Sequence, residues 1–172
     1  MGTYIISYFN KMKGGGKIAN SFNLSDSIVA VVGTFITIFV LLELTEMTQF
    51  PWMIGSFGAS TILVFVAWNA PVGQPRSVIG GHLISSFLGI LIFQLMGNSP
   101  LAISIAICLS LFCMLMTKTF HPPAGSDPLI IMVSQASWGF ILSPLLIGLA
   151  IILLSSLVIN NFHPKRNYPD YW

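Results

Sequence analysis

Long stretches without charged side chains are the feature that most constrains what this chain can fold into. No Lys, Arg, Asp or Glu occurs between Arg76 and Lys118, or between Asp127 and Lys165. Charged residues make up 7% of the 172 residues, against about 25% in an average soluble domain. Such apolar runs cross lipid bilayers as helices, because a helix satisfies its own backbone hydrogen bonds. The sequence therefore predicts an all-α, polytopic transmembrane helical bundle in contact with lipid, and a net charge of +2 gives no reason to expect nucleic acid.

A polar, proline-rich segment at residues 121–128 interrupts the apolar chain. Pro122 and Pro123 lack backbone N–H groups and push the preceding residue out of the helical region, so no transmembrane helix can run through them. We expect a new helix after this break, capped by Asp127 or Ser126 and with Pro128 at its first position. Lipid cannot satisfy irregular backbone, so the break must be buried in protein or line an aqueous cavity. The working site is therefore predicted here.

A second cluster of small and polar residues lies at residues 53–61. It allows two interpretations, close packing by another helix or an interrupted helix. A helix predicted at residues 77–96 also carries small and polar residues on its first half, so that end either packs tightly or faces a polar interior. These residues are Gly80, Gly81, His82, Ser85, Ser86 and Gly89.

One constant offset along the chain places Gly58 on Gly125 and Ser60 on Asp127. The halves at about 26–97 and 99–161 then share one order: a spanning helix, a polar break, a short apolar helix and a spanning helix. Weak internal symmetry of this kind is how transporter repeats appear in sequence. It predicts a 3+3 inverted repeat with short or broken helices at residues 54–69 and 127–139.

The charged residues provide an independent test of the number of crossings. Six crossings put every basic cluster on one face, and the positive-inside rule makes that face cytoplasmic. If residues 128–139 instead dip in and return, Lys165 and Arg166 fall on the opposite face, so the pattern favours six. We expect a cytoplasmic arm at 1–25 that contains a glycine break at 14–16 and could include a short amphipathic helix, a single transmembrane domain at 26–161, and a cytoplasmic tail at 162–172.

The two predicted short helices indicate a binding site. Helix N-termini carry unpaired N–H groups and about half a positive charge, which suits a small inorganic anion near the bilayer midplane. Arg76 and Lys118 either attract anions or only anchor the topology. We expect no metal and no cofactor. The predicted substrate-binding residues are Ser56, Gly58, Ala59, Ser60, Thr61, His82, His121, Pro122, Pro123, Gly125, Ser126 and Asp127.

Asp127 keeps other functions open, because a carboxylate at a helix N-terminus repels anions. One alternative is a cation- or proton-coupled transporter that uses Asp127 and His121. Another is a regulatory or structural membrane protein without transport. A membrane-embedded enzyme is not expected, since neither an HExxH nor a GxSxG motif is present. The glycine-rich faces leave open whether helices pack within one chain or in a homo-oligomer.

The sequence His-Pro-Pro-Ala-Gly at residues 121–125 resembles the signature of the HPP family of integral membrane proteins. Blocks at residues 55–60, 74–82, 160–161 and 168–172 also resemble that family, so the likeness covers about residues 26–172. The resemblance implies a bacterial or plastid-type membrane protein, for which nitrite transport has been proposed in photosynthetic lineages. Nitrite is thus the expected anion, and the bacterial inner membrane, with both termini cytoplasmic, the expected location.

Overall fold

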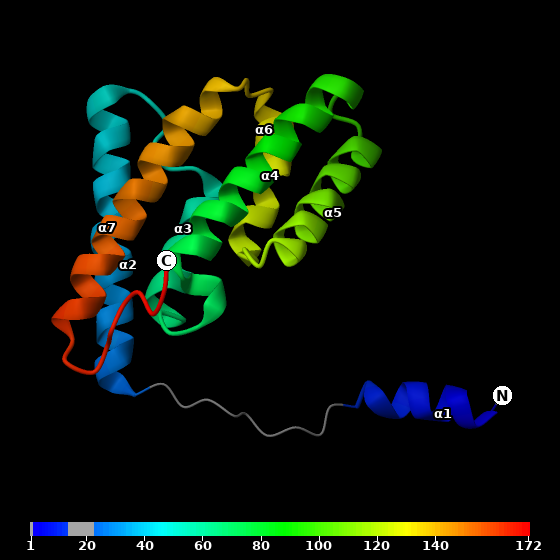
Figure 1. Ribbon diagram of the computed structural model, residues 1–172, viewed down its shortest axis with the longest axis horizontal. Helices are drawn as coiled ribbons and strands as arrows, with labels where there is room; N and C mark the ends of the chain where they lie inside the picture. Colours follow the sequence, from blue (N-terminus) through cyan, green and yellow to red (C-terminus); the bar gives the residue numbers. More distant parts are fainter. Residues whose placement is uncertain (1, 14–22) are drawn as a thin grey trace.

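The computed structural model describes residues 2–13 and 23–172, so the predicted glycine break at 14–16 lies outside the described residues. All regular secondary structure in the described ranges is helical, which confirms the all-α prediction. Figure 1 shows the order of the helices along the chain. They are α1 (Gly2–Lys11), α2 (Leu24–Thr48), α3 (Gly55–Val66), α4 (Pro75–Met96), α5 (Pro100–Met116), α6 (Asp127–Ser134) and α7 (Ile147–Phe162), with short helical turns at Pro71–Gly73, Pro122–Ser126 and Ile141–Leu146.

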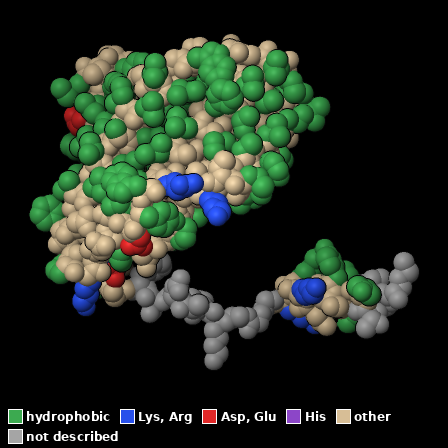
Figure 2. All heavy atoms as spheres, viewed as in Figure 1, with side chains coloured by type: hydrophobic (Ala, Val, Ile, Leu, Met, Phe, Trp, Pro, Cys, Tyr) green, Lys and Arg blue, Asp and Glu red, His purple; other side chains and the backbone are tan. Residues whose placement is uncertain are grey.

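Three helical segments are long and apolar enough to cross a membrane: α2, α4 and the continuous stretch Ile141–Phe162. The helices α3 and α5 are shorter and apolar, and α6 has 8 residues. Short helices therefore stand where the sequence predicted short or broken ones. Hydrophobic side chains are spread widely over the visible face of the bundle and charged ones are few there (Figure 2), as expected for a surface that meets lipid.

Local sequence explains where the spanning helices begin and end. The side chain of Asn23 caps α2 by accepting a hydrogen bond of 2.7 Å from the Asp26 amide, and asparagine is a favoured residue at this position. The helix ends where Gln49 adopts a left-handed conformation. Pro75 occupies the first turn of α4, and Gly97, with φ of 70°, ends that helix.

The start of α6 differs from the predicted cap. Ser126 has a helical backbone, and its hydroxyl donates to the carbonyl of Pro123 at 2.8 Å. The amide of Asp127 donates to the carbonyl of Ala124, and Pro128 has no amide to donate. The 3₁₀ turn thus leads directly into α6, and no side chain caps the start of that helix. The carboxylate of Asp127 is left free to turn into the bundle.

The final span is interrupted near its start. Ser143 has φ of −147° and ψ of 122°, outside the helical region, directly before Pro144. A residue before proline is disfavoured in the helical conformation, and proline cannot donate to the preceding turn. The sequence analysis overlooked this proline, and the regular part of the span begins only at Ile147.

The start of α2 and the tail after α7 lie at the same end of the bundle. Ser25 Oγ is 2.8 Å from His163 Nε2, and the Tyr168 hydroxyl donates to the carbonyl of Gly73 at 2.8 Å. The side chain of Arg76 at this end contacts the carbonyl of Thr117 at 3.3 Å. The bundle therefore brings Arg76, Lys118, Lys165 and Arg166 to one end, which we call the basic end, as the six-crossing reading requires.

The direction of the helices and the position of the charged side chains can be followed in Figures 1 and 2. The chain reverses direction from each helix to the next between α2 and α7, with α3 and α6 as the short members (Figure 1). Lys and Arg side chains gather along the lower part of the bundle (Figure 2). Glu43 and Glu46 lie on the last turns of α2, away from the basic end where that helix begins.

The packing of the helices has the pattern that an inverted repeat predicts. In one group, α2, α3 and α7 pack on one another. In the other group, α5, α6 and α4 pack on one another. Exchanging α2 with α5, α3 with α6 and α4 with α7 turns each of these pairs into another of them. Gly81 and Gly148, which the same offset pairs, are both closely packed: a Cβ at Gly81 would meet His121, and a Cβ at Gly148 would meet Phe57 of α3. The repeat itself stays a prediction.

Candidate functional site

Four fully buried side chains form one continuous chain of hydrogen bonds. Ser60 Oγ lies 2.8 Å from Nε2 of His82 and 2.9 Å from Nε2 of His121. His82 Nδ1 lies 2.6 Å from Oδ2 of Asp127, and His121 Nδ1 lies 2.7 Å from the carbonyl oxygen of Val72. The exposed fraction of each of these four residues is 0%. We call Asp127, His82, Ser60 and His121 the buried network.

Three helices and the proline break position these side chains. Ser60 is in the second turn of α3, His82 is in α4, and Asp127 is the first residue of α6. His121 precedes the prolines with an extended backbone, φ −136° and ψ 100°. It fits there because Gly81 has no side chain: a Cβ at Gly81 would lie 2.8 Å from the Cβ of His121. The sequence features that break the helices thus also assemble the network.

Counting protons shows what the buried network requires. A carbonyl only accepts, so His121 donates from Nδ1 to Val72, and its neutral ring then offers Nε2 as an acceptor. His82 likewise donates from Nδ1 to the Asp127 carboxylate and offers Nε2 as an acceptor. Both acceptors face the hydroxyl of Ser60, which has one proton. One further proton, placed on His82 Nε2, lets every hydrogen bond of the network form.

The charge of the buried network leads to the same requirement. An ionised carboxylate removed from water needs a compensating positive charge, because the low-dielectric interior cannot solvate it. Among the described residues, no Lys or Arg pairs with Asp127; its side-chain hydrogen-bond partners are His82 and Ser86. A proton shared by His82 and Asp127 makes the pair neutral overall. The network is therefore built to hold one proton beyond those of an ionised Asp127 and two neutral imidazoles.

Ser60, His82 and Asp127 have the order of a serine-hydrolase triad, but the surroundings differ. The amides next to Ser60 belong to α3 and donate within the helix, so they provide no oxyanion hole. A second imidazole, His121, also competes for the Ser60 proton, and the serine is fully buried. This geometry suits proton storage better than acyl transfer, and the absence of enzymatic activity stays a prediction.

Other predicted site residues lie outside the buried network. Ser56 and Thr61 are buried, whereas Ala59 and Pro122 are exposed and Gly58, Pro123, Gly125 and Ser126 are partly exposed. A Cβ at Gly125 would meet no atom within 4 Å, so nothing approaches that glycine closely. Arg76 and Lys118 are exposed at the basic end, and neither contacts the network.

Two groups that contribute to the site are not among the predicted substrate-binding residues. The hydroxyl of Ser86 donates to Asp127 Oδ2 at 3.3 Å, and the carbonyl of Val72 accepts from His121. Ser86 could have been found, because His82, Ser86 and Gly89 recur at helical spacing on one face of α4. The carbonyl of Val72 leaves no mark in the sequence, because any residue has one.

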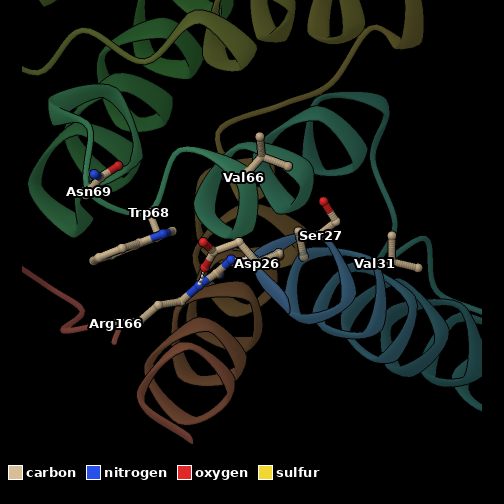
Figure 3. A pocket seen from close by; sticks show the side chains of 8 residues that line it. Asp26, Ser27, Val31, Val66, Trp68, Asn69 and Arg166 are labelled. Carbon is tan, nitrogen blue, oxygen red and sulfur yellow. Dashed lines mark hydrogen bonds and ion pairs between the residues drawn. The ribbon is translucent and has the colours of Figure 1, made fainter. Parts of the chain in front are cut away.

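A cavity of about 430 Å³ opens at the basic end (Figure 3). Arg166 lies at its edge, 6% exposed, and its guanidinium donates to Asp26 Oδ1 at 3.0 Å and to the carbonyl of Phe65 at 2.9 Å. The same group lies 5.6 Å from the centre of the Trp68 ring. The sequence analysis treated Arg166 only as a topology signal, but it fastens the tail to α2 and α3.

The tail is held by a second buried side chain. The phenol of Tyr168 donates to the carbonyl of Gly73 at 2.8 Å. Burial raises the pKa of Tyr168 to about 12, because the charged phenolate would lose its water. The phenol therefore stays neutral and remains a donor at physiological pH.

Comparison with known proteins identifies relatives of the whole bundle. A family model described as "HPP, transmembrane region" matches residues 19–169. Two transmembrane proteins of Dictyostelium discoideum are 35% identical over 181 residues and 36% identical over 184 residues. Each alignment covers 98% of this chain but 58% and 64% of the relatives, so the chain spans about three fifths of their length. No solved structure matches.

Proposed function

The chain belongs to the HPP transmembrane family, and from this we propose that it is a membrane transporter that moves a small inorganic anion together with protons. One observation supports the proposal above all others: a network of ionisable side chains is fully buried in a bundle of apolar helices. Its hydrogen bonds require one proton more than an ionised Asp127 and two neutral imidazoles hold. Ionisable side chains are expensive inside membranes and mark ion pathways and proton relays.

The neutral His82–Asp127 pair answers the main objection to an anion. A lone carboxylate near the start of α6 would repel an anion, but a protonated pair carries no net charge. The hydroxyl of Ser60 and the Nε2–H of His82 are then donors that an anion could accept from. Nitrite is the first anion to test, because the family resemblance implies it.

Charge balance sets the expected stoichiometry. An anion that enters the buried network adds one negative charge to a site that was neutral. His121 is the remaining base of the network, and its Nε2 can take one proton. We therefore expect one anion to travel with one proton, so that the occupied site is again neutral.

The proposal includes an arrangement in the membrane. The basic end faces the cytoplasm, in agreement with the positive-inside rule, and the protein resides in the bacterial inner membrane with both termini inside. The helices α3 and α6 act as the paired half-helices of a 3+3 inverted repeat. The buried network between them is closed in this conformation, so transport requires movement of one half against the other.

Proteoliposomes test this proposal directly. Purified protein is reconstituted, and uptake of nitrite, nitrate, chloride and formate is measured with an internal pH dye, with and without an imposed pH gradient. Nitrite uptake should acidify the lumen when driven inward. Asp127→Asn and His82→Gln should abolish the acidification, whereas Ser110→Ala should keep it, because Ser110 bonds only to its own helix at Ala106. Absence of flux for every anion would overturn the proposal.

A further inference from the structure

Next to the buried network lie oxygen atoms that have no hydrogen-bond partner. Among the described residues, four side-chain oxygens are buried and unpartnered: Ser56 Oγ, Thr61 Oγ1, Ser85 Oγ and Asp127 Oδ1. A buried polar atom without a partner costs free energy, so unpaired atoms that gather at one place indicate a ligand that pairs them. Asp127 is the most informative, because one carboxylate oxygen is bonded to His82 and the other is free.

Helix geometry places these oxygens on one side of the network. Both the end of α3 and the start of α4 lie at the basic end, so the two helices run in opposite directions (Figure 1). One turn from Ser60 toward the start of α3 is Ser56, and one turn from His82 toward the end of α4 reaches Ser85 and Ser86. Both steps lead away from the basic end. Ser56, Ser85, Ser86 and Asp127 therefore form an oxygen layer adjoining the network.

The chemistry of the oxygen layer selects the class of ligand. Its side chains offer hydroxyl and carboxylate oxygens and no nitrogen or sulfur, which suits a hard cation. Within the described ranges no group of three or more His, Cys, Asp and Glu is placed to hold a metal ion, so a transition-metal site does not fit. One carboxylate balances one positive charge. A divalent cation would leave an excess charge in the membrane interior, whereas a monovalent one would not.

We propose that the oxygen layer binds a monovalent cation of the size of Na⁺ or Li⁺ at Asp127 Oδ1, in exchange for the extra proton of the buried network. Either the proton at His82 or the cation at Oδ1 neutralises the single carboxylate, and both together would leave a net charge. When the cation enters, the proton leaves His82 Nε2 for water, so the charge of the core is unchanged. The inference rests on the network of the proposed function and adds a second coupling ion to it.

Few other groups can take part in this exchange. His82 and His121 are the titratable side chains that the network joins to Asp127. The sequences of α3 and α7 contain no ionisable side chain. The ionisable side chains of α5 are the thiols of Cys108, which is exposed, and Cys113, which is partly exposed. The linkage between proton and cation therefore centres on Asp127.

Binding is measured on the purified full chain in detergent. Thermal unfolding is followed in NaCl, LiCl, KCl and choline chloride at constant ionic strength, from pH 6 to pH 9. Na⁺ or Li⁺ should raise Tm relative to choline, and the apparent affinity should rise by up to about tenfold per pH unit where one proton competes. Equal Tm values in all four salts at every pH would overturn the inference.

Variants separate the oxygen layer from a general effect of salt. Asp127→Asn should abolish the cation-dependent shift, and Ser56→Ala and Ser85→Ala should each weaken it several-fold while the protein stays folded. Ser110→Ala is the matched control, since Ser110 is a buried serine with its hydroxyl already satisfied, and its shift should equal that of the wild type. An unchanged shift in both Ser56→Ala and Ser85→Ala would contradict the site.

The outcome can be distinguished from failure of the proposed function. If no cation shifts Tm but nitrite uptake still acidifies proteoliposomes, the cation site is wrong and anion–proton transport stands. If Na⁺ or Li⁺ binds with the expected pH dependence but no anion moves, the cation site stands and the anion transporter is wrong.

Discussion

His82 Nδ1 and Asp127 Oδ2 lie 2.6 Å apart, and both side chains are fully buried. The two residues come from different helices, α4 and α6, and neither has another charged neighbour within the network. A short, buried contact of this kind behaves as one unit, because removing either partner leaves the other without compensation.

A double-mutant cycle should reveal this unit. His82→Gln should destabilise the protein by about 3–5 kcal/mol, because the Asp127 carboxylate loses its counter-charge. The double variant His82→Gln with Asp127→Asn should be less destabilised than the sum of the single variants. Unfolding in mixed micelles measures each value. Additive losses would show that the two side chains act independently.

The second prediction concerns the nucleophilicity of Ser60. A fluorophosphonate probe should not label the folded protein, since Ser60 is buried and its neighbouring amides are engaged in α3. Mass spectrometry of the intact chain detects the adduct, and a known serine hydrolase in the same tube controls for probe activity. Labelling of wild type that disappears in Ser60→Ala would instead identify an enzyme.

Two glycines of the site should respond differently to the same substitution. Gly81→Ala places a Cβ 2.8 Å from the Cβ of His121 and 3.1 Å from the carbonyl of Thr119. It should cost about 1–3 kcal/mol, because a packed contact must move apart. Gly125→Ala meets nothing within 4 Å and should change stability by less than about 0.5 kcal/mol.

The comparison of Gly81 and Gly125 also tests the position of His121. Proton-coupled uptake should fall in Gly81→Ala, since displacing His121 breaks its link to Ser60. If Gly125→Ala lowers proton-coupled uptake more than Gly81→Ala does, the close contact between Gly81 and His121 does not position His121.

The tail provides a matched pair of basic residues. Arg166 donates to Asp26, to Phe65 and to Asn160, whereas Lys165 is exposed. Arg166→Ala should cost about 1–3 kcal/mol, because the buried acceptors at Phe65 and Asn160 lose their donor, while Asp26 is partly exposed to water. Lys165→Ala should remain within about 0.5 kcal/mol of the wild type.

Limited proteolysis provides a second measurement of the tail. Cleavage after residue 162 should accelerate in Arg166→Ala and not in Lys165→Ala. Equal cleavage rates in the two variants would show that the guanidinium does not fasten the tail.

The sequence predicted those features that depend on neighbouring residues along the chain. Pro122 and Pro123 interrupt a transmembrane α-helix whatever surrounds them, and the chain forms only a short 3₁₀ turn there. Charge placement predicted which residues share the basic end, because a spanning segment must return across the same bilayer. These predictions needed no knowledge of which helices touch.

The pairings within the site could not be read in the same way. Asp127 looked like an N-cap, but a 3₁₀ turn leads directly into α6 and no side chain caps that helix. Its actual partner, His82, lies on another helix and is brought near only by tertiary packing. Ser60, His82, His121 and Asp127 were each selected as candidates, but the order in which they bond depends on tertiary distances.

The hydrogen bond from His121 to the carbonyl of Val72 connects the buried network to a loop at the basic end. His82 lies about 10 Å from the start of α4 and about 21 Å from its end, at 1.5 Å per residue. A charge released toward the basic end thus passes a thin dielectric barrier, and one released toward the far end passes a thick barrier. Most of a transmembrane voltage would fall across the thick side, so the step toward the far end should be the electrogenic one.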